Sequence, residues 1–161
     1  MADRNELTFK SFLQTITIIH IAFIGGLLVF SAIAYFQFTD WVFILPTNDL
    51  FFIITPTLAL ASIYLGNFLF RKKISAILGK KSLRQRLTTY QSAILIKFAF
   101  TEGAAFVCIM IALLKGNLFY LGLALLCIVY FISLKPTQAK IEQQLALKGE
   151  LKEQMDKGNI N

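Results

Sequence analysis

Few residues in this chain could do chemistry, and the first of them is Glu102, a carboxylate inside the apolar segment Tyr90–Leu114. A charged side chain near the middle of a bilayer costs several kcal/mol unless it is paired, so by default it indicates a functional site. Because desolvation disfavours the charged form, we expect Glu102 to be protonated at neutral pH. Two interpretations stay open: a neutral carboxyl that makes a structural hydrogen bond, or a site that carries a proton or an ion.

A few other polar residues fall inside apolar segments. Counting about 1.5 Å of rise per residue places two threonines at nearly the height of Glu102, whereas a lysine and the histidine fall in the inner half, where Tyr64 and Asn67 also lie. We therefore predict an intramembrane polar site formed by Glu102, Thr55, Thr57, Lys97 and His20. Purely structural roles remain open for two of these residues. The Lys97 side chain can extend to the membrane surface, and His20 can be a satisfied hydrogen-bond donor.

Basic residues without any acid occupy one short stretch between two apolar segments: Arg71, Lys72, Lys73, Lys80, Lys81, Arg84 and Arg86. A net charge of +7 can indicate nucleic-acid binding. A basic loop between two spans, however, is what the positive-inside rule predicts for the cytoplasmic side. We therefore attribute the charge first to topology, with binding of anionic lipid or of a protein partner as the alternative, and we expect no nucleic-acid partner.

Sequence motifs for hydrolysis, nucleotide binding and metal-dependent catalysis are missing, including H-E-x-x-H, G-x-S-x-G, the P-loop and the Rossmann glycine pattern. The chain has one histidine and two cysteines, Cys108 and Cys127, which lie inside apolar segments without the spacing of metal ligands. We expect these cysteines to be small packing residues. We also expect no enzyme activity, no metal and no cofactor.

Four apolar segments must position these residues. Of the 161 residues, 57% are hydrophobic and 16% are charged, against about 45–50% and about 25% in soluble domains. Each segment is close to the ~20 residues that a helix needs to cross a bilayer, and irregular backbone is not tolerated against lipid. The sequence thus predicts an all-α integral membrane bundle of four transmembrane helices, the last two joined as a hairpin: Thr15–Phe36, Leu50–Phe70, Thr88–Leu114 and Leu118–Leu134.

The basic loop determines the orientation that we expect. With this loop in the cytoplasm, both termini are cytoplasmic as well, and the segment Asp40–Asp49, which has no Lys or Arg, lies outside. We predict a four-helix transmembrane domain over residues 1–134 and a cytoplasmic tail over residues 135–161, in which an amphipathic helix of about five turns follows Thr137. Ala32-Ile33-Ala34 resembles a signal-peptidase site, but the apolar stretch before it is long, so we expect a retained span.

Small residues recur every fourth position on three of the spans, which is typical of close helix–helix contacts in membranes. The longest row, on the third span, is Ala104, Cys108, Ala112 and Gly116. The shorter pairs are Ala99 with Gly103, Ser62 with Gly66, and Ala22 with Gly26. We expect the third span to be the central helix, and we favour contacts inside the monomer over a dedicated dimer face.

Three stretches carry a family resemblance: YQSAILIKFAFTEGAAF from Tyr90, LLKGNLFY from Leu113, and LKPTQAKIEQQL from Leu134. Through them the chain resembles a group of uncharacterised small bacterial four-span proteins, over most of its length from Thr17 to the tail. The resemblance implies a multi-pass protein of the bacterial inner (cytoplasmic) membrane. The run from Glu102 to Ala105 is also similar to one helix of the rotor-ring subunit of rotary ATPases, but the long glycine-repeat helix beside it is missing.

These observations favour a non-enzymatic accessory or interaction subunit, whose basic loop and tail would contact a partner. The second hypothesis is a small proton-coupled transporter or conduit that uses Glu102, which would require a homo-oligomer because four spans are few for alternating access. The third is binding of anionic lipid by the basic loop. The substrate, the partner and the choice between a homo- and a hetero-oligomer stay open.

Overall fold

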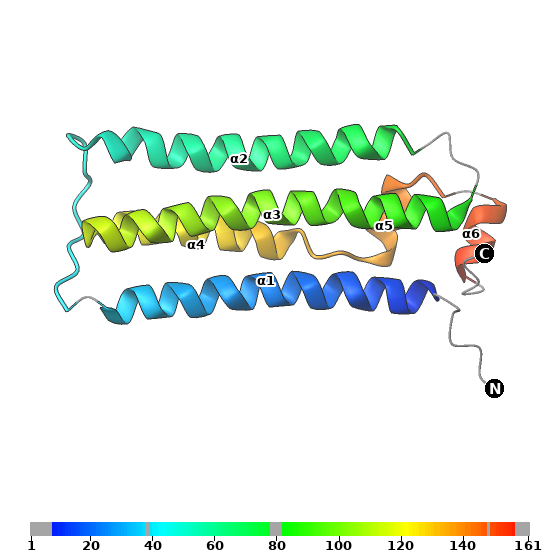
Figure 1. Cartoon of the computed structure of the whole chain (residues 1–161), viewed down its shortest axis with the longest axis horizontal. Coiled ribbons are helices and arrows are strands. Elements are labelled where there is room, and N and C mark those ends of the chain that lie inside the picture. Colours follow the sequence, from blue (N-terminus) through cyan, green and yellow to red (C-terminus); the bar gives the residue numbers. More distant parts are fainter. Residues whose placement is uncertain (1–7, 38, 78–81, 148, 157–161) are drawn as a thin grey trace.

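Four long helices and two short ones make up the part of the chain that the structure describes. The computed structural model describes residues 8–37, 39–77, 82–147 and 149–156. Its helices are α1 Phe9–Gln37, α2 Leu50–Ser75, α3 Leu83–Lys115, α4 Leu118–Ser133, α5 Gln138–Gln144 and α6 Glu150–Asp156. The long helices lie side by side, and α5 and α6 lie at the end where α1 begins (Figure 1). We call this the tail end, and the opposite one, with residues 39–49, the loop end.

Three of these helices, α1, α2 and α3, are long and apolar enough to cross a membrane. The fourth long helix, α4, has 16 residues. A bend of 80° separates it from α5, and the two make a fourth span only if they are counted together. Over its described residues the structure therefore confirms an all-helical fold with three or four candidate spans, as expected of a multi-pass membrane protein.

Local signals set the helix ends at the loop end. Asp49 caps α2 by accepting a hydrogen bond from the N–H of Phe51 (3.1 Å), and Asn117 caps α4 by accepting one from the N–H of Phe119 (2.9 Å). Between α3 and α4, Gly116 adopts a left-handed conformation with φ of 58°. Glycine adopts this conformation without the steric cost of a Cβ, so it ends α3 and lets the chain reverse. The predicted hairpin of the last two long segments is present.

The central helix is α3, which contacts α1, α2 and α4. Three residues of its longest small row are buried: Ala104, Cys108 and Ala112. On the α2 side, Ser62 donates a hydrogen bond to the backbone carbonyl of Phe100 (2.8 Å). A Cβ added at Gly66 would lie 2.8 Å from the Cβ of Phe100. The small-residue contacts predicted for these two rows are therefore made inside the monomer.

At the loop end, the loop of residues 39–49 contacts the turn between α3 and α4. Val42 exchanges backbone hydrogen bonds with Gly116 (3.1 Å) and Leu118 (2.9 Å). An ion pair of 2.8 Å between Lys115 Nζ and Asp49 Oδ2 joins the end of α3 to the start of α2. The hairpin tip is thus held by backbone and side-chain contacts at once.

This ion pair predicts a pH dependence of stability. The Lys115 ammonium first, and then the N–H of Phe51, hold the pKa of Asp49 below its ordinary value. Because the folded pKa lies below the unfolded one (about 3.9), the ionised carboxylate stabilises the fold above that pH, and the contribution is lost as pH falls through the folded pKa. We expect Asp49→Asn to lower the Tm at pH 7 and to match the parent protein at about pH 2–3.

Thermal unfolding in detergent across this pH range measures the effect. Asp40→Asn is the control, since it removes an exposed carboxylate from the same loop. A Tm difference between Asp49→Asn and the parent that stays constant from pH 7 to about pH 2–3 would contradict the prediction.

The tail forms two short helices, and the prediction of one helix of about five turns is wrong. Ala146 (φ 47°) and Gly149 (φ 57°) adopt left-handed conformations between α5 and α6. Burial explains the turn, because apolar side chains from both pieces reach the protein interior: Ile141, Leu145, Leu147 and Met155. A straight helix would carry the last of these away from the bundle.

Polar contacts hold the same segment against α3. Arg86 Nη1 donates to the backbone carbonyl of Leu145 (3.0 Å), and Tyr90 Oη donates to Oε1 of Gln144 (3.0 Å). Arg86 and Tyr90 are themselves buried. The tail is therefore folded onto the tail end of the bundle.

Candidate functional site

Glu102 lies near the middle of α3, on the side that faces α1. One turn to either side, Phe98 contacts the ring of His20 and Phe106 stacks on Phe30, each with ring centroids 4.9 Å apart. The Glu102 side chain is partly exposed. Within the described part of the chain, no hydrogen bond or ion pair reaches its carboxyl. Glu102 thus lies at the edge of the α1–α3 contact, where the bundle meets its surroundings.

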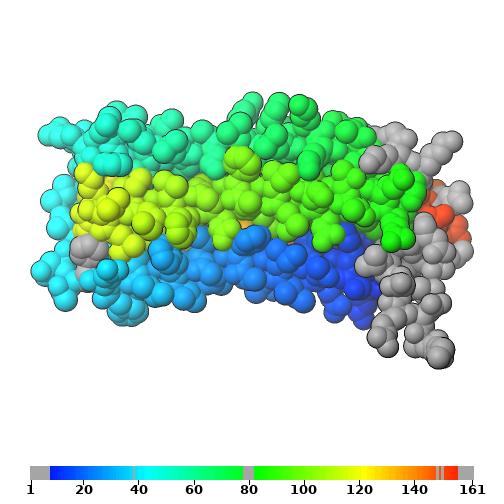
Figure 2. Space-filling view, viewed as in Figure 1, coloured from blue at the N-terminus to red at the C-terminus, as the bar shows by residue number. Residues whose placement is uncertain are grey.

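The surface beside Glu102 is uncovered and made of small residues. Ala99 and Gly103 are exposed, and a Cβ added at Gly103 would meet no atom within 4 Å. The space-filling view shows α3 uncovered between α1 and α2 (Figure 2). On α1, Ala22 and Gly26 are exposed as well. The expectation of contacts inside the monomer is wrong for these two small pairs, which face outward.

The threonines predicted to lie at the height of Glu102 lie elsewhere. The hydrogen bond from Ser62 to Phe100 sets the register of α2 against α3. From that contact, Thr55 lies about 10.5 Å toward the loop end and Glu102 only about 3 Å. Glu102 also points about 200° around α3 from Phe100, away from α2. The heights predicted from the sequence were wrong because the apolar segment of α3 begins about 6 Å nearer the tail end of the bundle than the apolar segment of α2 does.

The other predicted members of the polar site have contacts of their own. Thr57 donates to a backbone carbonyl of its own helix (2.7 Å). His20 is buried, with Nε2 2.9 Å from the carbonyl oxygen of Phe131. Because a carbonyl only accepts, this nitrogen carries the proton. The Lys97 ammonium lies 5.3 Å from the centroid of the Phe70 ring. No described contact joins the five predicted residues into one site.

Three hydroxyls are buried without a hydrogen-bond partner among the described residues: Ser31, Thr55 and Tyr120. They come from three different helices. Cys108 and Cys127 are free and buried. In the described ranges, no group of three His, Cys, Asp or Glu residues could hold a metal ion.

The predicted basic loop divides into parts with different surroundings. Lys80 and Lys81 lie outside the described residues. The others lie near the end of α2 or in the first turn of α3: Arg71, Lys72, Lys73, Arg84 and Arg86. Arg84 is exposed, whereas Arg86 is buried and donates to Leu145. Arg86 therefore faces the tail of its own chain.

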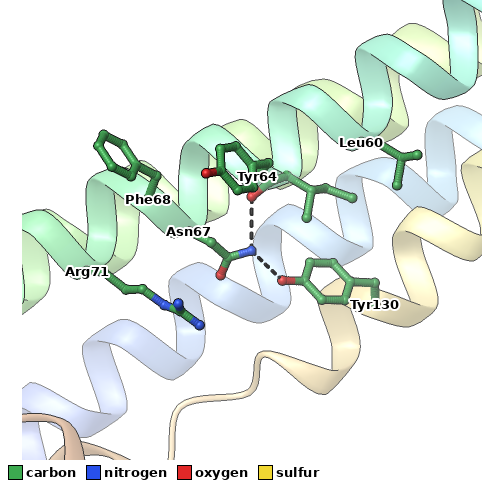
Figure 3. A pocket seen from close by; sticks show the side chains of 7 residues that line it. Leu60, Tyr64, Asn67, Phe68, Arg71 and Tyr130 are labelled. Carbon is green, nitrogen blue, oxygen red and sulfur yellow. Dashed lines mark hydrogen bonds between the residues drawn. The ribbon is translucent and has the colours of Figure 1, made fainter.

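A groove between α2 and α4 was not predicted as a site. Asn67 Nδ2 donates to the carbonyl of Ile63 (2.9 Å) and to Tyr130 Oη (2.9 Å), which bridges the two helices (Figure 3). The bridge borders a cavity of about 640 Å³ that Tyr64 and Arg71 also line. The sequence places Tyr64 and Asn67 in the inner half of the membrane. The pairing of Asn67 with Tyr130 could not be predicted, because it depends on how α4 lies against α2.

The two faces offer different chemistry. Glu102 presents a carboxyl to whatever covers α3, while the groove presents N–H and O–H donors and a guanidinium. No protein-family model matches the chain, and the searches of curated proteins and of solved structures found no match. The function is therefore inferred from these two faces.

Proposed function

We propose that this chain is a non-enzymatic subunit of a membrane-protein complex, bound to its partner through the face of α3 that carries Glu102. The observation that carries the proposal is the partly exposed carboxyl with no described partner, beside the uncovered Ala99 and Gly103. We further propose the bacterial inner membrane, with the basic tail end in the cytoplasm, in keeping with the positive-inside rule.

The energetics favour a covered face over a lipid-exposed one. An acidic side chain at the centre of a span costs about 2.5–3.5 kcal/mol on insertion scales when nothing pairs with it. A neighbouring helix that donates a hydrogen bond or a positive charge to Glu102 removes much of that cost. Small residues next to the carboxyl allow such a helix to approach closely, because Gly103 has no side chain and Ala99 has only a methyl group to hold the backbones apart. The occupant is therefore a transmembrane helix with a donor side chain.

A different protein fits this face better than a second copy. A two-fold symmetric dimer uses the same patch from both chains, so it would bring one Glu102 toward the other. Two carboxyls at one site disfavour each other's charge, whereas a donor side chain from a different protein pairs with an oxygen of Glu102 whether or not Glu102 is protonated. For the conduit alternative, the described contacts do not bring Thr55, Thr57, Lys97 or His20 to Glu102.

A pair of glycine variants tests the proposal. Gly103 and Gly122 are both exposed, and an added Cβ meets no atom within 4 Å at either position. We expect Gly103→Leu to reduce the co-purified partner by about tenfold or more, because a leucine blocks close approach. Gly122→Leu on α4 is the matched control and should retain the partner.

Photo-crosslinking from Ala99, followed by mass spectrometry, identifies what covers the face. The expected product is a peptide from a transmembrane helix of another protein with a basic, hydroxyl or amide side chain. Equal partner recovery from both glycine variants, or crosslinks only to lipid or to a second copy of the chain, would overturn the proposal.

A further inference from the structure

Three adjoining hollows lie along most of α2: two lie between α2 and α4, and the third is lined by α2 together with Lys97 of α3 and Gln144 of α5. The central one, of about 640 Å³, shares Leu60, Ile63 and Tyr130 with a second of about 450 Å³ toward the loop end. It shares Asn67 and Arg71 with a third of about 370 Å³ toward the tail end. Shared lining residues make this one elongated groove on the outside of the bundle.

The end of the groove nearer the tail is polar and basic. Arg71 and Lys97 line it, and its described lining residues include no carboxylate. The Tyr130 hydroxyl accepts a hydrogen bond from Asn67, while its own proton takes part in no hydrogen bond to a described residue. Figure 3 shows the Arg71 guanidinium on the same side of α2 as the Asn67 amide and Tyr130. This end therefore offers a guanidinium, an ammonium and a free O–H to an anion.

Cations from three helices lie close together at this end. Arg71 and Lys140 both act on Lys97 as neighbouring positive charges. Lys140 itself donates to the carbonyls of Ser133 and Lys135 (3.0 and 3.1 Å) at the end of α4. An anion bound here would relieve the repulsion between these cations and gain charge-assisted hydrogen bonds.

The other end of the groove is apolar. The second hollow is lined by Pro56, Ala59, Leu60, Leu123 and Leu126 together with three other residues, among which Tyr130 marks its border with the polar part. Leu60 and Leu126 are 68% and 67% exposed, so this end opens toward the surroundings of the bundle. The rise of α2 from Arg71 to Pro56 is about 22 Å, against about 15 Å for one hydrocarbon leaflet. A long alkyl chain fits this part.

We propose that the α2–α4 groove binds one anionic membrane lipid, with its phosphate at Arg71, Lys97 and Tyr130 and an acyl chain along Leu60 and Leu126. Basic pockets between transmembrane helices bind anionic lipid headgroups. Here the apolar hollow adjoins the basic end of the groove, so an acyl chain and a phosphate of the same lipid can be bound together. The proposal is independent of the Glu102 face, which lies on the surface of α3 between α1 and α2 (Figure 2).

Adjacent cations on α2 give a matched test. Arg71 and Lys72 are both exposed, but only Arg71 lines the groove. Native mass spectrometry of the full chain from detergent micelles would measure binding of phosphatidylglycerol and of phosphatidylcholine with the same acyl chains. We expect tighter binding of phosphatidylglycerol, a roughly tenfold loss in Arg71→Gln, and a change of at most about twofold in Lys72→Gln.

A second pair of variants tests the acyl part. Leu60 lines the groove and Leu58 does not, while both are exposed (68% and 51%). We expect Leu60→Trp to weaken phosphatidylglycerol binding by roughly fivefold, because it fills the chain site, and Leu58→Trp to leave it unchanged. Thermal unfolding of each variant checks that the fold is kept.

Two results would overturn the proposal. Equal losses in Arg71→Gln and Lys72→Gln would mean that the basic surface attracts lipid without a specific site. An unchanged affinity in Leu60→Trp, together with displacement of the lipid by millimolar inorganic phosphate, would mean that the groove holds a free anion and no acyl chain.

Discussion

Gly66→Leu is expected to lower the free energy of unfolding by about 3 kcal/mol, at the upper end of the range for overpacked interiors. The first added carbon already lies 2.8 Å from the Cβ of Phe100 and 3.5 Å from the carbonyl oxygen of Lys97. Neither atom is the far end of a flexible side chain, so α2 and α3 must move apart. That movement also stretches the nearby hydrogen bond from Ser62 to Phe100. Unfolding in mixed micelles with a rising fraction of SDS measures the loss.

The same substitution at Gly122 is the control for this prediction. At Gly122 nothing lies within 4 Å of the added Cβ, and leucine favours a helix over glycine by roughly 0.8–1 kcal/mol. We therefore expect Gly122→Leu to be neutral or slightly stabilising. If both variants unfold at the same SDS fraction as the parent, close packing of α2 on α3 at Gly66 does not hold the bundle together.

Apolar length was sufficient to predict that the long segments are helices. The ends of α2 and α4 follow from Asp49 and Asn117, whose side chains accept from the N–H two residues later, and the hairpin follows from Gly116. These are local effects, since each depends on a few neighbouring residues. Short-range chemistry of this kind can be read from a sequence without knowing how the helices pack.

Register between helices could not be predicted in the same way. The predicted heights hold only if all apolar segments start at the same level. The contacts of Ser62 and Gly66 with Phe100 instead shift α2 along its axis relative to α3. The shift separates Thr55 from Glu102, and the position of α4 against α2 places Asn67 beside Tyr130. Polar groups on different helices therefore meet according to tertiary contacts. Glu102 itself was identified from its surroundings in the sequence, but the face that it occupies was not.

The tail differs from its prediction for a related reason. Its apolar residues are spaced roughly as in one helix, and spacing alone predicts a single surface helix. In the structure Leu145 and Met155 are both buried, and the chain turns at Ala146 and Gly149 to allow it. Burial against the bundle outweighs the cost of a left-handed alanine, which is of order 1–2 kcal/mol.

Arg86→Gln is expected to release this tail from the bundle. Arg86 is buried in the first turn of α3, and its Nη1 donates to the carbonyl of Leu145 at 3.0 Å. A hydrogen bond from a charged group contributes about 1.5–3 kcal/mol, and the shorter glutamine cannot replace a guanidinium that reaches across to another segment. Amide hydrogen exchange in residues 138–147 should therefore become roughly 10- to 100-fold faster.

Arg84→Gln is the matched control for this last prediction, because it removes the same charge two residues earlier, where the side chain is exposed. Loss of charge alone would speed exchange equally in both variants, whereas loss of the contact with Leu145 would act only through Arg86. Equal protection of residues 138–147 in both variants would contradict the role of Arg86 as the tail's anchor. The expected difference divides the basic stretch in two: Arg86 serves the fold of its own chain, which leaves Arg71 and the other exposed cations to meet an anionic surface or lipid.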